Sequence, residues 1–314
     1  MKRKAQRIRD PLHNLIEFRS RNQLEQTLWR VIRTRPFQRL RRIRQLGFSE
    51  FVYPGATHTR FAHSIGAFHT ARNLMEVIQA HIRSGDGEVQ DVQQTVALAA
   101  ALVHDVGHGM FSHAFEDVGK KLSLKMADHE HVSDFLIRNS EIGHELAELG
   151  SGFANDVAEV TGRGRPGGLY DAVVSSQFDA DRLDYMQRDR LMTGVRNSGI
   201  DFVWLINNLV LAEVPFGSDE EKGGKVQTFV LSAKAIHEAE TYILSLFQLY
   251  PTVYFHKATR GAEKLFSQIM MQLVKLARDG SVAQAGLPAN HPIIRFALEP
   301  EHIDNVLALD DTVF

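Results

Sequence analysis

Histidine is concentrated in one part of this 314-residue chain, where it could bind a metal ion or transfer protons. His104 and Asp105 end an almost wholly apolar segment, residues 92–106. An ionised carboxylate without a partner is costly in such surroundings, so it needs hydrogen bonds or a metal. Gly107 and Gly109 then let the backbone turn sharply beside a ligand. Nine of the fifteen histidines lie between residues 57 and 131: His58, His63, His69, His81, His104, His108, His113, His129 and His131.

Each histidine also has an ordinary structural interpretation. A single histidine on an apolar helix is more often a core residue than a ligand, but His104 has Asp105, His108 and His113 close by in the sequence. For His63 the two interpretations are balanced, although its stretch is dense in polar residues. The remaining isolated histidines are interpreted as surface or core residues: His69, His81, His144, His237, His291 and His302.

A second carboxylate for the same ion has to come from a distant segment. Residues 178–189 supply Asp181, Asp184 and Asp189 at helical spacing, on neighbouring faces. The same charge pattern is also typical of a solvated helix face. From the pattern alone the solvated face is the better interpretation, and only the family resemblance below favours Asp181 as a ligand.

Hydrophobic spacing predicts a mostly helical protein with two small hairpins. Residues 7–18 predict a hairpin or extended arm, and residues 209–214 and 226–231 a second strand pair. The segment 92–106 is apolar on all sides, which predicts a buried central helix. We expect a loop over residues 161–168. Further helices are predicted over residues 23–46 with a break at Pro36, 58–82, 111–125, 128–139, 141–149, 180–191, 235–250 and 253–278.

Composition limits the chemistry. The chain is 44% hydrophobic and 24% charged, with net charge −2, which is typical of a globular protein. It has no cysteine, so a metal would be held by histidine, carboxylate, backbone or water, as suits Mg, Mn, Fe or Zn. No apolar run reaches the length of a membrane span, and the basic start lacks the apolar core of a signal peptide. We therefore expect a cytoplasmic protein.

Five ordered motifs together resemble the dNTP triphosphohydrolase branch of the HD-domain phosphohydrolases. His63, His104–Asp105 and Asp181 match the H…HD…D signature of that family. The resemblance implies a helical HD fold in one domain, residues 1–314, with the catalytic core in 7–210 and a hairpin and helical part in 211–314. The chain ends where a helix is predicted to begin, so we expect a C-terminal portion to be missing. The motifs are Asp10–Asn14, Phe37–Gly47, Tyr53–Ser64, His104–His113 and Asp181–Asp189.

The resemblance also implies roles for individual residues. The implied metal ligands are His63, His104, Asp105 and Asp181. Arg60 and Arg182 would hold phosphates, since the guanidinium fork suits them. The implied catalytic group is His113 as general acid, His129 next, with His108, Glu116 and Glu130. The residues implied to surround the sugar are Gln45, Leu46, Tyr185, Asp189 and Tyr254.

Two positions depart from regulated members of that branch. Residues 245–253 carry no basic residue where those enzymes grip the triphosphate, and Arg33 stands where they have an acidic residue that reads an activating guanine. Both differences argue against GTP-dependent activation of that kind, and the first weakens a strict preference for triphosphates. Whether another nucleotide activates the protein stays open.

Residues 30–44 hold seven arginines and no acidic residue. Three interpretations remain open: a solvated helix face, a nucleotide-binding or subunit-interface site, and weak contact with nucleic acid through its phosphates. The arginines are Arg30, Arg33, Arg35, Arg39, Arg41, Arg42 and Arg44.

Two other functions compete with a dNTPase. The same metal chemistry would serve a nucleotidase or phosphodiesterase acting on nucleoside monophosphates or cyclic nucleotides. A nucleotide- or nucleic-acid-binding regulator with an inactive site is the alternative outside enzymes. By resemblance we expect a nucleotide substrate and a homo-oligomer, either a dimer or a tetramer.

Overall fold

The computed structural model describes residues 5–85, 88–196, 200–215 and 224–314. Two antiparallel hairpins are its only strands within this described part. In the first, Ile8 faces Ile16; in the second, Leu211 faces Phe229. The predicted strand pairs are thus confirmed, while the connection of the second, residues 216–223, lies outside the described residues. The strands are β1 Gln6–Asp10, β2 Asn14–Phe18, β3 Leu209–Pro215 and β4 Lys225–Leu231.

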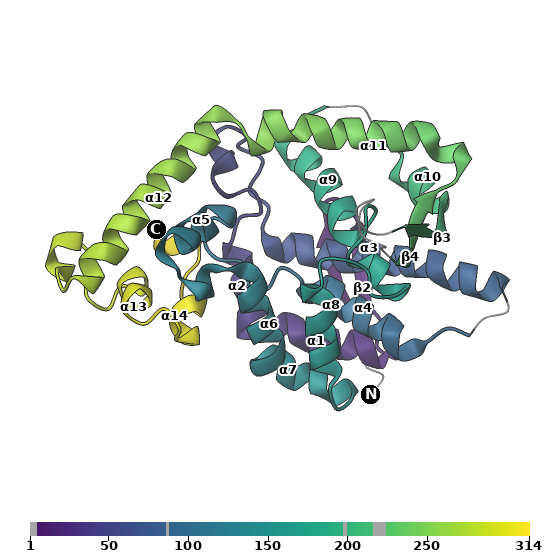
Figure 1. Cartoon of the computed structure of the whole chain (residues 1–314), viewed down its shortest axis with the longest axis horizontal. Coiled ribbons are helices and arrows are strands. Elements are labelled where there is room, and N and C mark those ends of the chain that lie inside the picture. Colours follow the sequence, from purple (N-terminus) through teal and green to yellow (C-terminus); the bar gives the residue numbers. More distant parts are fainter. Residues whose placement is uncertain (1–4, 86–87, 197–199, 216–223) are drawn as a thin grey trace.

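Helices make up most of the molecule, as predicted (Figure 1). Those up to residue 193 are α1 Gln23–Arg33, α2 Arg35–Arg39, α3 Arg60–Ser84, α4 Asp91–Val103, α5 His113–Leu122, α6 His129–Asn139, α7 Glu141–Leu146, α8 Phe153–Gly162 and α9 Ala180–Thr193. The later ones are α10 Phe202–Asn207, α11 Ile236–Leu249, α12 Lys257–Arg278, α13 Pro292–Leu298 and α14 Ile303–Leu307. A single π-helical turn, Tyr250–Tyr254, joins α11 to α12. None of the described helices is both long and apolar enough to cross a membrane.

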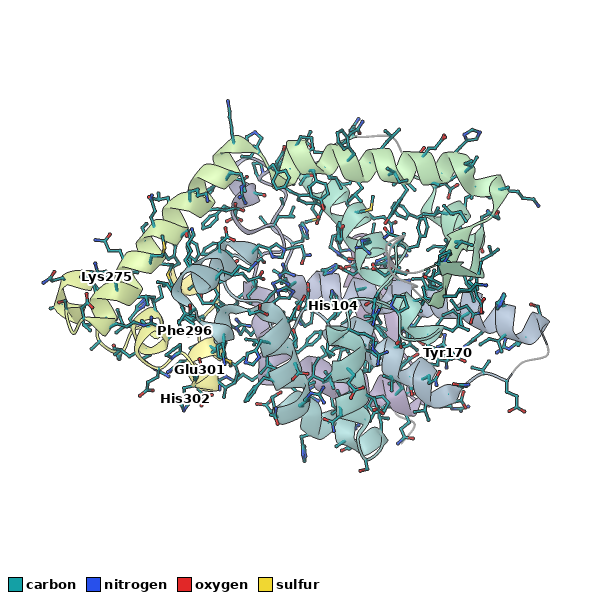
Figure 2. The ribbon with its side chains drawn as sticks, viewed as in Figure 1. His104, Tyr170, Lys275, Phe296, Glu301 and His302 are labelled. Carbon is teal, nitrogen blue, oxygen red and sulfur yellow. The ribbon has the colours of Figure 1, made fainter. Side chains whose placement is uncertain are left out.

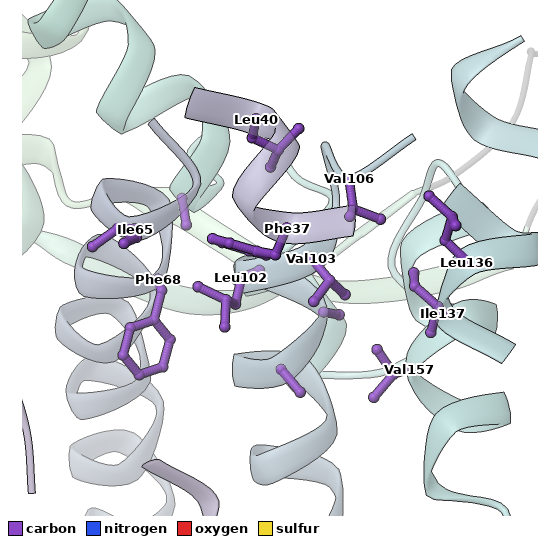
Figure 3. Close-up of a cluster of buried hydrophobic side chains, with 14 of the residues drawn as sticks. Phe37, Leu40, Ile65, Phe68, Leu102, Val103, Val106, Leu136, Ile137 and Val157 are labelled. Atoms are coloured by element: carbon purple, nitrogen blue, oxygen red, sulfur yellow. The ribbon is translucent and has the colours of Figure 1, made fainter. Parts of the chain in front are cut away.

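Helix α4 lies in the core, because its second half is apolar on every side. Residues 96–103 of α4 are all buried, and the helix packs between α3 and α8. Figure 3 shows Leu102 and Val103 between Phe68 of α3 and Val157 of α8. The buried cluster continues past residue 211, where it includes Phe229, Phe266 and Phe296.

Several element boundaries differ from the predicted ones. Thr34 separates α1 from α2, so the break comes two residues before Pro36, which sits in the first turn of α2. Helix α4 ends at Val103, so His104 caps it and Asp105 lies in the following turn. Helix α8 covers the first two residues of the predicted 161–168 loop, and α12 begins four residues later than predicted, because the π-turn precedes it. The short helices α8, α10, α13 and α14 were not predicted from the sequence.

Candidate metal centre and active site

Three helices bring the predicted metal ligands together at the centre of the fold. His63 comes from the first turn of α3, His104 from the end of α4, and Asp181 from the first turn of α9. His63 Nε2 lies 3.3 Å from His104 Nε2 and 2.9 Å from Asp181 Oδ1, and His104 Nε2 lies 3.6 Å from the same oxygen. Asp105 faces the same point, with Oδ1 3.4 Å from His104 Nε2. In Figure 2, His104 appears near the middle of the molecule.

The hydrogen bonds on the far side of each imidazole fix its tautomer. His63 Nδ1 lies 2.8 Å from Asp184 Oδ2, and His104 Nδ1 lies 3.0 Å from the carbonyl oxygen of Ala101. Both partners accept hydrogen bonds, so each Nδ1 carries the proton. Two Nε2 lone pairs therefore face one another beside a carboxylate. That arrangement repels itself unless a cation lies between the groups, so these residues fit a divalent metal ion.

Electrostatics point the same way. Burial opposes a second proton on His63, but Asp181 and Asp184 outweigh burial and raise its pKa to about 10, so without a metal ion a proton on Nε2 lies between His63 and Asp181. Burial likewise opposes protonation of His104, while Asp105 and Asp181 raise its pKa above the usual value. The pKa of Asp181 is lowered, because the two histidines outweigh its burial. The centre thus binds positive charge strongly, which a metal ion would supply.

A buried ionic network supports His63 from behind. Asp184, one turn before Arg188 on α9, accepts bonds from Arg188 Nε at 2.8 Å and from His63 Nδ1. Arg188 Nη1 also donates to Asp10 Oδ2 at 2.8 Å, and His13 Nε2 lies 2.6 Å from Asp184 Oδ1. Asp184 and Arg188 are completely buried. The N-terminal hairpin therefore reaches the metal centre through its turn.

Three further histidines surround one carboxylate beside the centre. His129 Nδ1 lies 2.8 Å from Glu116 Oε1, while His108 Nδ1 and His113 Nδ1 each lie 3.3 Å from a Glu116 oxygen. These three contacts outweigh burial and hold the pKa of Glu116 far below its usual range. His108 stacks on His129 with ring centroids 4.0 Å apart. Burial and the nearby Arg60 lower the pKa of His108 to about 4, so it is neutral at pH 7.

Two adjoining cavities open over these groups. The metal-side cavity, of about 300 Å³, is lined by Arg60, His104, Asp105, His108, His113, His129, Glu130 and Asp181, among others. The tyrosine cavity, of about 400 Å³, is lined by Leu46, Asp189, Tyr250, Tyr254, Arg260 and Glu263, among others. Both cavities are also lined by Gln45, Arg60, His113 and Tyr185.

Sequence comparison identifies the family of this arrangement. Residues 60–186 match the HD domain, and residues 222–285 match the HD associated region. The chain belongs to the HD-domain family. This family is metal-dependent, in agreement with the donor set at the centre.

This HD-domain chain is similar to several curated proteins and to a solved crystal structure. The uncharacterized protein YwfO of Bacillus subtilis is 34% identical over 88% of this chain and 57% of its own length. The deoxynucleoside triphosphate triphosphohydrolase SAMHD1 homolog of Dictyostelium discoideum is 31% identical over 74% of this chain and 43% of its own. A crystal structure of a Bacteroides thetaiotaomicron phosphohydrolase superposes with a TM-score of 0.75 and 28% identity, over 98% of this chain and 70% of that one. The chain spans about half the length of the first curated relatives it matches.

Most residues implied by the HD resemblance lie at the two cavities, but Arg182 does not. Its Nη1 donates to Asp179 Oδ2 at 2.8 Å and to the carbonyl oxygen of Ser176. Adjacent residues on a helix point about 100° apart, so Arg182 cannot share the direction of Asp181. Arg60 is in place, bonded to Asp105 and, through Nε, to Ser112 Oγ at 2.9 Å.

Several residues of this HD site are not predicted from the sequence as part of it. The helical spacing of Asp184 does not reveal its contact with His63, because that contact depends on how α9 packs against α3. His58 bonds Asp189 Oδ1 at 2.8 Å, and Asp189 Oδ2 accepts from Tyr254 at the same distance. Arg260 and Glu263 enter from the first turns of α12, where the sequence pattern shows only a surface helix.

Three arginines of the arginine-rich segment pair with acidic residues far away in the sequence. Arg30 pairs with Glu145 at 2.6 Å and also with Glu148. The C-terminal segment supplies partners for Arg35 and Arg42, namely Asp304 and Asp310. These pairs favour a structural role for the segment, and contact with nucleic acid stays a prediction.

Proposed function

We propose that the protein hydrolyses deoxynucleoside triphosphates to deoxynucleoside and triphosphate, using a divalent metal ion. One observation carries this: the Nε2 atoms of His63 and His104 converge with Asp181 beside a cavity that is lined by Arg60 and further histidines. The relatives named deoxynucleoside triphosphate triphosphohydrolase support the choice of substrate.

His63, His104, Asp105 and Asp181 would hold the metal. A divalent ion held there would polarise a phosphoryl oxygen and lower the pKa of a bound water, so that a nucleophile forms near neutral pH. Two imidazoles and two carboxylates suit Mn, Fe or Zn, and also accept Mg.

The histidines around Glu116 would handle the leaving group. A water oxygen forms a bond to the α-phosphorus while the bond from phosphorus to the 5′-oxygen breaks, and that oxygen must gain a proton. His113 is our first choice of donor and His129 the second, because Glu116 holds each Nδ1 and leaves Nε2 available to the cavity. Arg60 would stabilise the developing negative charge. His108, which is neutral, and Glu130 at the cavity wall would assist in binding and proton exchange.

The tyrosine cavity would hold the deoxyribose. Gln45 lines it, and the side-chain oxygen of Gln45 is buried without a hydrogen-bond partner among the described residues. A buried polar atom of this kind is satisfied when a ligand hydroxyl reaches it. Tyr185 lines both cavities, as a residue between the sugar and the phosphates must.

A nucleotidase or phosphodiesterase is the second candidate, favoured by the position of Arg182. The side chain of Arg182 is bonded to Asp179, so among the two arginines implied to hold phosphates only Arg60 lines the metal-side cavity. A single arginine suits a substrate with fewer phosphates than a triphosphate. Incubation of metal-loaded protein with dNTPs, dNMPs and cyclic nucleotides, with and without an added nucleotide activator, separates the candidates. Triphosphate as product supports the dNTPase, and phosphate released from dNMP supports the alternative. Nucleotide binding without turnover would indicate a regulator.

We also propose that the protein forms homo-oligomers. Helix α11 exposes Ile243, Leu244 and Phe247, whose side chains are 56–70% accessible in the single chain. A second copy would cover this apolar face. Light scattering measures the molar mass of the parent and of Phe247→Glu, and the variant should form fewer oligomers than the parent. A monomeric parent would contradict this proposal.

We expect Tyr185 to make the protein select deoxyribonucleotides over ribonucleotides. Deoxynucleotides should be hydrolysed at least about tenfold more efficiently than ribonucleotides, a barrier difference of about 1.4 kcal/mol, because a ring beneath C2′ leaves no space for a hydroxyl. Tyr185→Ala should narrow the gap with the metal still bound, whereas Tyr185→Phe, which keeps the ring, should preserve it. The ratio of kcat/KM for dGTP and GTP decides the matter, and equal values in the parent would contradict this sugar pocket.

Glu116 should set the alkaline limit of the reaction. Burial opposes protonation of His129, but the bond to Glu116 raises its pKa overall. Glu116→Gln removes the negative charge, so His129 should lose its proton at a lower pH. If His129 donates to the leaving group, the alkaline limb of the kcat/KM profile moves to lower pH in this variant. An unmoved limb would exclude the His129–Glu116 pair as the proton source.

A further inference from the structure

One carboxylate near the C-terminus joins two loops that reach the active site from different parts of the chain. The backbone N–H groups of Arg44 and Phe111 donate to the two oxygens of Asp311, each at 2.7 Å. Gln45 follows the first amide directly, and His113 comes two residues after the second. Asp311 therefore spans the segments that carry a sugar-side residue and our first choice of proton donor.

The second loop has a conformation that needs such support. Phe111 and Ser112 have φ values of 51° and 54°, in the left-handed region that non-glycine residues rarely adopt. Consecutive residues of this kind persist only where their surroundings hold them. The Ser112 hydroxyl accepts from Arg60 Nε at 2.9 Å and donates to the carbonyl of Arg44 at 3.0 Å. The strained loop thus also fixes the guanidinium of Arg60, which lines both cavities.

Asp311 is itself held in place by its neighbours. Leu309 is fully buried, and its carbonyl accepts from Arg39 Nε at 2.9 Å. Asp310 pairs with Arg42, and Phe314 packs edge-on against Phe111. The segment from residue 309 to 314 is therefore held in one position beside both loops.

We propose that Asp311 is a positioning residue, whose carboxylate holds the 43–46 and 110–113 loops in the geometry that hydrolysis requires. It acts through the two backbone amides and through Ser112, and it does not touch the substrate. This inference rests on the proposed function, since it concerns the same two cavities. A misplacement of about 1 Å in such a group can cost about a hundredfold in rate.

Asp311→Ala and Asp311→Asn test this role, with Asp304→Asn as matched control. Asp304 lies seven residues before Asp311, on α14, and is exposed; its carboxylate pairs with the side chain of Arg35 instead of with the two loops. In Asp311→Ala we expect kcat to fall at least about tenfold, with metal content unchanged and a smaller change in KM. Asp311→Asn keeps one acceptor oxygen, so it should lie between Asp311→Ala and the parent. The control should match the parent.

Hydrogen exchange gives a readout that does not depend on turnover. The amides of residues 44–46 and 111–113 should exchange faster in Asp311→Ala and unchanged in Asp304→Asn. If the parent hydrolyses no nucleotide, the proposed function fails, and exchange alone decides whether Asp311 holds the loops. Parent-like kcat and exchange in Asp311→Ala would overturn the proposal. So would a loss of kcat that the Asp304 variant shares equally, because docking of the whole segment would then be the cause.

Discussion

Alanine at His104 or at Asp105 should leave the purified protein without tightly held metal, whereas we expect the parent to carry about one Mn, Fe, Mg or Zn ion per chain. The physical reason is the pair of facing Nε2 atoms, which a cation must separate. Loss of the ion removes several kcal/mol of charge stabilisation in the transition state. At about 1.4 kcal/mol per factor of ten, kcat/KM should fall roughly a thousandfold. Elemental analysis and the nucleotide assay measure the two effects separately.

His144→Ala is the matched control for this experiment. His144 is an exposed histidine on α7, away from both cavities, so this variant should keep the metal and the activity. Unchanged metal content in both His104→Ala and Asp105→Ala would show that the ion, if present, is bound elsewhere. Metal lost from only the His104 variant would remove Asp105 from the ligand set and leave the rest of the centre in place.

The sequence points to candidate residues of this centre where the chemistry is local. His104 and Asp105 stand out because polar residues end an apolar helix, and burial of α4 confirms the premise. Only the family resemblance identifies Asp181 as a candidate ligand, since the charge pattern around it favours a solvated helix face. Its approach to His63 depends on the packing of α9 against α3, which no spacing along the chain encodes.

Other parts of the site could not be predicted for similar reasons. The left-handed conformation of Phe111 and Ser112 has no sequence signature, because neither residue type favours it. Asp311 contacts Arg44 across 267 positions of sequence. The acidic partners of Arg30, Arg35 and Arg42 also lie more than 100 positions away, so these arginines look unpaired in the sequence and are paired in the fold.

The buried network behind His63 depends on a glycine in the middle of α3. A methyl group at Gly66 would come within 2.0 Å of Asp184 Oδ1 and 2.2 Å of Arg188 Nη2. No side chain fits there unless both charged groups move. Asp184 also accepts the proton of His63 Nδ1, so its displacement would release the imidazole that faces the metal.

Gly66→Ala should therefore destabilise the protein, although alanine is the better helix former. Disruption of a buried ion pair costs about 3–5 kcal/mol in the free energy of unfolding. Loss of the carboxylate that orients a metal-bound histidine typically costs about 10–100-fold in metal affinity. Urea denaturation measures the first effect, and a competitive metal titration of the folded protein measures the second.

Gly261→Ala is the control that separates these effects from the general cost of a methyl group. Gly261 also lies inside a long helix, α12, and a methyl group there meets nothing within 4 Å in the described part of the chain. Helix propensity alone should make this variant up to about 1 kcal/mol more stable. Asp184→Asn removes the charge without adding bulk, and it should lower metal affinity as Gly66→Ala does. If Gly66→Ala instead unfolds at the parental urea concentration and binds metal with parental affinity, the network is not needed to orient His63, and the metal centre relies on its four ligands alone.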